Sequence, residues 1–169
     1  LLLCRVAQGE TPGAVSANIT GAQSGDVVVA INDATEEAPT GQGALLVFHR
    51  GQRGYALAHK RAGQGQIALI EAADINRDGQ ADLVYSDTAC GAHTCFGTLY
   101  VESWDGQAYA DWIEGEPTIA GPEYTVEDVS KDGQGQEIIV YGGVIGSVGA
   151  GPQRAWTETY ISPAGAAYR

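Results

Sequence analysis

The sequence repeats itself with a period of about 55 residues, and a repeat of that length limits the chain to a few architectures. A carboxylate followed by a β-branched or apolar run occurs three times, at Asp26–Val29, Asp82–Tyr85 and Glu137–Val140. The carboxylates lie 56 and 55 residues apart. Each run has the composition of a buried β-strand.

A second landmark recurs in step with the first. A glycine that is followed closely by a tyrosine occurs at Gly51, Gly106 and Gly165, at separations of 55 and 59 residues. Two landmarks with one period predict three repeats. Their expected boundaries are an N-terminal segment at 1–25, then repeats at 26–73, 74–127 and 128–169.

Each repeat is expected to contain about four short antiparallel strands. In the middle copy these are Asp82–Ser86, Gly97–Trp104 and Ala108–Ile113, with Tyr124–Glu127 leading into the next repeat. Asp105-Gly106 fits the turn of a hairpin, because both residues tolerate a positive φ. No stretch sustains helical periodicity with caps over ten residues. The prediction is an all-β fold of propeller-type repeats.

Three repeats do not complete a ring, because propellers have about four to eight blades. The third repeat is also short, since Arg169 follows soon after its expected hairpin. The segment 1–25 could supply a missing strand to its own chain or to another copy. We therefore expect a part of a longer propeller, or copies that complete one another by strand complementation.

The segment from Asp74 to Asp82 carries the clearest chemical signal. Oxygen-bearing side chains occupy its positions 1, 3, 5 and 9, and Gly79 permits a sharp turn at position 6. Ca²⁺ takes about six to eight oxygen ligands, which alternating side chains of a tight loop can aim at one centre. An EF-hand would place Glu at position 12, where this chain has Tyr85. The loop is instead expected to run straight into a strand.

This loop and strand resemble the FG-GAP/VCBS repeats of integrin α-subunit propellers and of many exported bacterial proteins, over residues 18–169. The segment Cys90–Cys95 with Tyr100–Gly106 is also similar to uncharacterised exported bacterial repeat proteins. The resemblance implies side-chain ligands for calcium and a carbonyl ligand from Gln80. The implied set in this loop is Asp74, Asn76, Asp78, Gln80 and Asp82.

The other two repeats depart from this pattern. In the third, Asp128, Ser130 and Asp132 keep positions 1, 3 and 5, Gln134 could offer its carbonyl, and Glu137 comes one residue late. We expect calcium there too, because Glu is longer than Asp. The first repeat has Asn18, Thr20, Ala22, Ser24 and Asp26 at the corresponding places, so it lacks the turn glycine and a carboxylate. That site is expected to be empty. The alternative for all three loops is an acidic surface turn.

The three cysteines suggest an oxidising compartment. Cys90 and Cys95 bracket a short polar loop that a disulfide closes easily, which favours export. Free thiols, or a metal site that includes His93, are the alternatives, although no second ligand pair exists for a structural zinc site. Cys4 would then be free, intermolecular or a weak candidate for lipidation.

Charge and motifs exclude several classes of function. A formal net charge of −12 argues against nucleic-acid binding. Apolar runs such as Val27–Ile31 are far shorter than a membrane helix needs. His49 and His59 could approach each other across a hairpin, but as surface or packing residues. Ser86, Asp87 and His93 supply triad residue types without a nucleophile elbow. The glycine-rich segment 142–151 has no helix after it to bind phosphate.

The sequence therefore predicts a non-catalytic, extracellular calcium-binding β-repeat protein with a structural or adhesive role. It would be secreted or attached to the cell surface. One alternative is a self-assembling subunit of a surface fibre. Another is a module whose loops and aromatic residues bind a protein or a glycan.

Overall fold

The computed structural model describes residues 13–21, 23–33, 41–91, 93–115, 117–145, 155–162 and 167–169. These residues form β-strands joined by turns and contain no helix, so the all-β prediction is confirmed. The strands are β1 (Ala14–Ala17), β2 (Asp26–Asn32), β3 (Gly43–Gly51), β4 (Gly54–Ala62), β5 (Gln66–Ala73), β6 (Asp82–Cys90), β7 (Cys95–Trp104), β8 (Tyr109–Asp111), β9 (Thr118–Ala120), β10 (Glu123–Glu127), β11 (Glu137–Gly142) and β12 (Trp156–Tyr160). Within the described ranges no helix is present that could cross a membrane.

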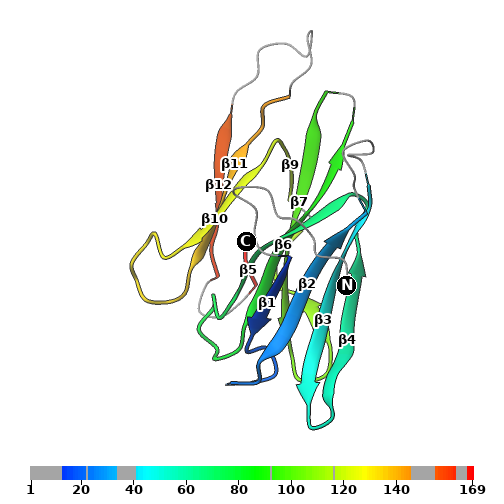
Figure 1. The fold of residues 1–169 in the computed structure, drawn as a ribbon. Coiled ribbons are helices and arrows are strands. Elements are labelled where there is room, and N and C mark those ends of the chain that lie inside the picture. The colour runs from blue at the N-terminus through cyan, green and yellow to red at the C-terminus, as the bar shows by residue number, and fades with distance from the viewer. Residues whose placement is uncertain are drawn as a thin grey trace.

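The strands make three antiparallel sheets. The first sheet has the order β1-β2-β3-β4, the second β5-β6-β7-β8 with β9 on β7, and the third β10-β11-β12. In Figure 1 the first sheet (blue to cyan) and the third (yellow to orange) lie on opposite sides of the second (green). None of the described strands closes a barrel.

The repeat seen in the sequence corresponds to one position in the sheets. Asp26, Asp82 and Glu137 are the first residues of β2, β6 and β11, which are the second strands of their sheets. The strand before each acidic loop pairs with the strand after it, so β5 and β10 belong with β6 and β11. Each sheet therefore begins one strand before the repeat boundary drawn from the sequence.

The N-terminal segment contributes to its own chain. β1 pairs antiparallel with β2, with Ala14 opposite Val29 and Ala17 opposite Asp26. Of the two uses expected for residues 1–25, the structure shows the intramolecular one for 14–17. Cys4 and Ala22 lie outside the described residues.

Two cores hold the sheets together. The first lies between the first and second sheets and includes Val28, Leu45 and Tyr85. The second lies between the second and third sheets and includes Val84, Val101 and Ile138. The second sheet is covered on both faces, and for this reason residues 82–87 of β6 are all buried.

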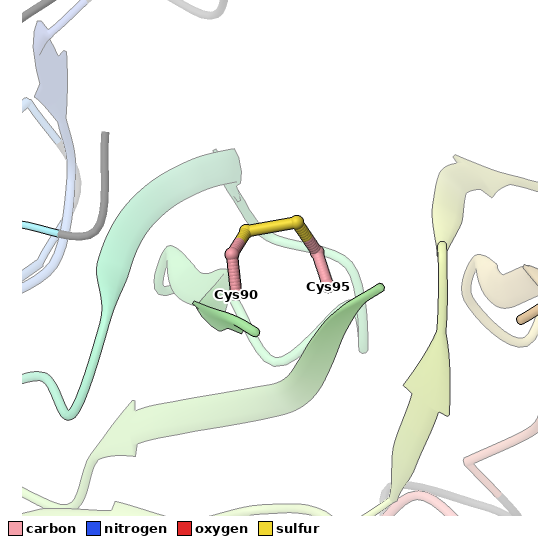
Figure 2. The surroundings of a disulfide bond; sticks show 2 residues. All are labelled: Cys90 and Cys95. Carbon is pink, nitrogen blue, oxygen red and sulfur yellow. A yellow bond between two sulfur atoms is a disulfide. The ribbon is translucent and has the colours of Figure 1, made fainter. Parts of the chain in front are cut away.

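Two short connections agree with local sequence signals. Cys90 and Cys95 pair across the β6–β7 hairpin and form the expected disulfide (Figure 2), so the free-thiol and metal alternatives do not apply to them. The β7–β8 hairpin turns at Asp105-Gly106, but through four residues rather than two. The Asp105 amide donates to the Ala108 carbonyl at 3.1 Å, and Gly106 takes a φ of 100°.

Candidate metal-binding loops

The acidic loops of the second and third sheets share one backbone conformation. At loop position 4, Arg77 and Lys131 have φ values of 63° and 55°, and at position 6, Gly79 and Gly133 have 93° and 74°. Positive φ is uncommon for residues other than glycine. Two left-handed residues in each loop fold its side chains back toward the strand that follows.

The third loop gathers three carboxylates. Oxygen atoms of Asp128, Asp132 and Glu137 lie within 4.8 Å of one another. Among the described residues no other group of three acidic, histidine or cysteine side chains approaches this closely. Without a cation, three negative charges at this separation repel one another.

Hydrogen bonds orient the carboxylates of the third loop. The Ser130 hydroxyl donates to Glu137 Oε1 at 2.8 Å, and the Val129 amide donates to Oε2 at 2.7 Å. The bond from Ser130, with those from the amides, holds the pKa of Glu137 below its usual range. The Gln134 amide donates to Asp132 Oδ1 at 2.7 Å. Asp128 Oδ1 is buried and accepts no hydrogen bond from the described residues.

The second loop brings together three of its five predicted ligands. Asn76 Nδ2 lies 3.2 Å from Asp78 Oδ2 and 3.3 Å from Asp82 Oδ1. The positive end of the Asn76 amide thus faces these two carboxylates, and its Oδ1 accepts from the Asp78 backbone amide at 2.9 Å. Ligation of an ion by Oδ1 requires the side-chain amide to turn over. Asp74 Oδ2 accepts from the Gly79 amide at 3.0 Å, and the carboxylates of Asp74, Asp78 and Asp82 do not form a group as close as the one in the third loop. The backbone amide of Gln80 donates a hydrogen bond to Asp78 Oδ1 at 2.8 Å.

Asp82 is the most deeply buried carboxylate of the second loop, at 1% exposed. The Ser103 hydroxyl of β7 donates to its Oδ1 in a short hydrogen bond. Its Oδ2 is buried and has no hydrogen-bond partner in the described part of the chain. Burial raises the pKa of Asp82 to about 6, and the nearby charge of Asp78 adds to that effect. A buried carboxylate with an oxygen left unsatisfied is a costly arrangement unless a cation binds.

The first loop satisfies its carboxylate with protein donors. Thr20 donates to Asp26 Oδ2 at 2.9 Å through both its amide and its hydroxyl, and the Ser24 hydroxyl donates at 2.7 Å. The Arg50 amide donates to Oδ1 at 2.8 Å. Burial alone would raise the pKa of Asp26, but these bonds outweigh it and lower the pKa. This carboxylate needs no cation.

The second and third loops are in direct contact. Arg77 Nη1 donates to the Gly133 carbonyl at 2.7 Å, and Nη2 lies 3.5 Å from Asp128 Oδ2. The Gln136 amide donates to the Ile75 carbonyl at 2.7 Å. The Tyr168 hydroxyl donates to the Gln136 carbonyl at 2.8 Å. Order in one loop is therefore linked to order in the other.

Sequence reasoning missed Ser103 and Arg77 as members of the site. Ser103 is 21 residues from Asp82 and reaches it only because β6 and β7 pair. Arg77 reaches the third loop only because the second and third sheets pack together. Neither contact follows from the nine-residue pattern, so no signal in the sequence could have identified it.

The donor set of both loops suits calcium. It consists of carboxylate, amide and hydroxyl oxygens, the ligands that a hard cation prefers. In the third loop Asp128, Asp132 and Glu137 would hold the ion, with Ser130 beside them. In the second loop Asp78, Asp82 and Asn76 would hold it. The unsatisfied oxygens of Asp82 and Asp128 are the observations that favour an ion in each.

His49, His59 and Asp87 have other partners. His49 Nε2 lies 2.7 Å from the Tyr109 hydroxyl, and His59 stacks on the Tyr109 ring at 4.4 Å between centroids. His59 also contacts buried Glu102 at 2.9 Å. Asp87 accepts from the amides of Gln64 and Gly65, at 2.6 and 2.8 Å, and so anchors the β4–β5 connection.

No family model, curated protein or solved structure matches this chain.

Proposed function

We propose that this chain is a non-catalytic, calcium-binding β-repeat protein with a structural or adhesive role outside the cell. The convergence of the Asp128, Asp132 and Glu137 carboxylates within 4.8 Å carries the proposal. Close like charges on a folded loop favour binding of a cation, and of these three carboxylates only Asp128 is paired with a basic side chain of the described residues, Arg77. The resemblance to FG-GAP/VCBS repeats supports the same ion. By that resemblance, each sheet would be one propeller-type blade.

The comparison of the three loops supports two calcium sites rather than three. Asp26, Asp82 and Glu137 start equivalent strands. Asp26 has both oxygens satisfied by its own loop and by β3, and it is the only carboxylate of that loop. Glu137 also accepts hydrogen bonds at both oxygens, but Asp128 and Asp132 lie beside it. Threonine and serine donors in the first loop take the role that calcium would have in the second. Asp82 keeps an unsatisfied oxygen in the same position.

Calcium would act as a structural element at the contact between the second and third sheets. The loops touch through Arg77 and through the bond from Gln136 to Ile75. An ion in either loop would fix the side chains of that loop. Because the same loop also contacts the other one, the ion would stabilise the contact between the two sheets. The Cys90–Cys95 disulfide supports an oxidising, and hence extracellular, location.

Of the two alternatives from the sequence, self-assembly by an exchanged N-terminal strand gains no direct support. β1 pairs with β2 of its own chain, so residues 14–17 are not free to complete a sheet of another copy. This removes the simplest form of strand complementation. A glycan- or protein-binding module is a separate hypothesis with no contact of the described residues to support it.

Thermal unfolding tests the calcium proposal. With free calcium at about 100 times Kd, one site adds about 2.7 kcal/mol to the free energy of unfolding, which raises the Tm by about 5–10 °C for a chain of this size. Asp132→Asn should reduce the calcium-dependent rise in Tm, and Asp33→Asn, at an exposed position outside the loops, should leave it unchanged. Equal Tm values in calcium and in EGTA would refute the proposal.

A further inference from the structure

The first sheet has an apolar face that belongs to neither core. We call it the first end face; it consists of Val27, Val29, Ile31, Leu46, Phe48 and Leu57. Val27, Phe48 and Leu57 lie in one row across β2, β3 and β4. Neither core cluster includes any member of this face. Leu57 is 55% exposed and Ile31 is 40% exposed. The other four members are partly buried. Contiguous apolar side chains that a sheet face leaves exposed are typical of an interaction surface.

The third sheet has a corresponding free face on the opposite side of the molecule. We call it the third end face; it consists of Glu123, Thr125, Ile139, Tyr141, Thr157 and Thr159. Glu123, Tyr141 and Thr157 form one row, and Thr125, Ile139 and Thr159 form the next. Tyr141 is 47% exposed, and neither core cluster contains Tyr141 or Ile139.

The two internal contacts between sheets follow one rule, which is clearest when residues are counted from the carboxylate that starts the second strand. The first core contains Val28, at position +2 of β2, together with Leu83 and Tyr85, at positions +1 and +3 of β6. The second core contains Val84, at +2 of β6, together with Ile138 and Val140, at +1 and +3 of β11. An even face thus packs on the odd face of the next sheet in both contacts.

The two end faces are the unused halves of this rule. Val27 and Val29 of the first end face are at positions +1 and +3 of β2, so the first sheet offers a free odd face. Ile139 and Tyr141 of the third end face are at positions +2 and +4 of β11, so the third sheet offers a free even face. In both internal contacts, the face with even-numbered positions of one sheet packs on the face with odd-numbered positions of the next. The free face of the third sheet could therefore pack on the free face of the first sheet of another copy in the same way.

Charge favours the same pairing. Lys60, beside Leu46 in the register, and Arg50 lie on the strands of the first end face. These are two of only nine basic residues in a chain of net charge −12. The strands of the third end face carry Glu123 and Glu127 instead. Opposite charge on two surfaces steers them together, whereas two third end faces would repel each other.

We infer that the third end face of one copy packs on the first end face of a second copy. The contact is head to tail, so two copies that make it reciprocally form a closed dimer, and copies that make it in series form a filament. It uses strands rather than the acidic loops, and it therefore does not depend on the proposed calcium sites. The exposed rows of Leu57 and Tyr141 lie inside the contact.

Sedimentation of two single-face variants tests the inference. The 169-residue chain at about 100 μM, above the Kd of weak but specific interfaces, should sediment as multiples of its 17.6 kDa mass. Leu57→Glu spoils the first end face and Tyr141→Arg spoils the third. Each variant alone should associate at least about thirty-fold more weakly, as expected for a residue central to an interface. Mixed one to one, they should form a heterodimer, because each still offers one intact face.

Matched controls separate the loss of this contact from a general effect of the added charge. Gln107→Glu and Gln107→Arg make the same charge changes in the exposed β7–β8 turn and should leave association unchanged. Both test variants should keep the wild-type far-ultraviolet spectrum and melting transition, because the replaced side chains are half exposed. A wild-type chain that stays monomeric overturns the inference. The first end face would then be covered by residues of its own chain or left open to solvent. Dissociation by only one variant overturns it in favour of a symmetric contact between like faces.

Discussion

Replacing Asp82 by Asn in the calcium-free protein should stabilise the fold at neutral pH. Asp82 is 1% exposed, its Oδ2 has no hydrogen-bond partner among the described residues, and burial raises its pKa from the ordinary value of 3.8 to about 6. Because the folded-state pKa is above the unfolded one, the neutral acid fits the fold better than the carboxylate. The associated stability is fully present below about pH 3.8 and is lost as the pH rises through 6.

The size of this effect follows from the rise in the pKa of Asp82. A rise from 3.8 to about 6 corresponds to about 3 kcal/mol, of which about half is already lost at pH 5 and nearly all by pH 7. Asn has the shape of Asp without the charge and can still accept from Ser103. In EGTA at pH 8, Asp82→Asn should therefore raise the free energy of unfolding by up to about 3 kcal/mol. In calcium the gain should shrink or reverse, because the variant loses a ligand.

Urea denaturation in EGTA, between pH 5 and pH 8, measures this directly. Asp26→Asn is the matched control, since Asp26 occupies the equivalent position but accepts four hydrogen bonds and has a lowered pKa. Its contribution has the opposite sign, being present above pH 3.8 and lost as the pH falls. The control should therefore destabilise the protein at pH 8. If both variants destabilise the calcium-free protein equally, the unsatisfied oxygen of Asp82 carries no energetic cost and the reasoning is wrong.

Two further predictions concern the rest of the molecule. Glu102→Gln should lower the free energy of unfolding by about 3 kcal/mol at pH 7 in urea denaturation, because it leaves Arg61 and His59 without the buried carboxylate that they contact. Burial opposes ionisation of Glu102, but those contacts and Tyr85 outweigh it and lower its pKa. The loss of stability in the variant should therefore disappear as the pH falls through that pKa. A loss of stability that persists at low pH would contradict this. Removing the disulfide with Cys90→Ser and Cys95→Ser together should cost about 2 kcal/mol, the chain-entropy value for so short a loop, and a thermal melt with no change would show that the hairpin closes without it.

Local patterns in the sequence predicted what local physics determines. The start of β6 at Asp82, the disulfide hairpin and the turn at Asp105-Gly106 each depend on a few neighbouring residues. The first loop was expected to lack calcium because it lacks a carboxylate at Ala22 and a glycine at Gln23. The structure adds the physical reason: Thr20 and Ser24 donate the hydrogen bonds that stabilise the Asp26 carboxylate.

The parts that the sequence could not predict depend on contacts between distant segments. The bond from Ser103 to Asp82 requires the register of β6 against β7. The contact of Arg77 with Asp128 requires the third sheet to pack on the second. The hydrogen bond from the Gly79 amide to the Asp74 carboxylate depends on how the loop turns at Gly79. A motif fixes residue types but not these choices.

Isothermal titration of the chelator-treated chain with calcium tests the central claim most directly. We predict binding of two calcium ions per chain, one at Asp128, Asp132 and Glu137 and one at Asn76, Asp78 and Asp82. Asp132→Asn should abolish or weaken one of the two binding events and leave the other. A titration that shows no binding to the folded chain would contradict the assignment of calcium to these loops.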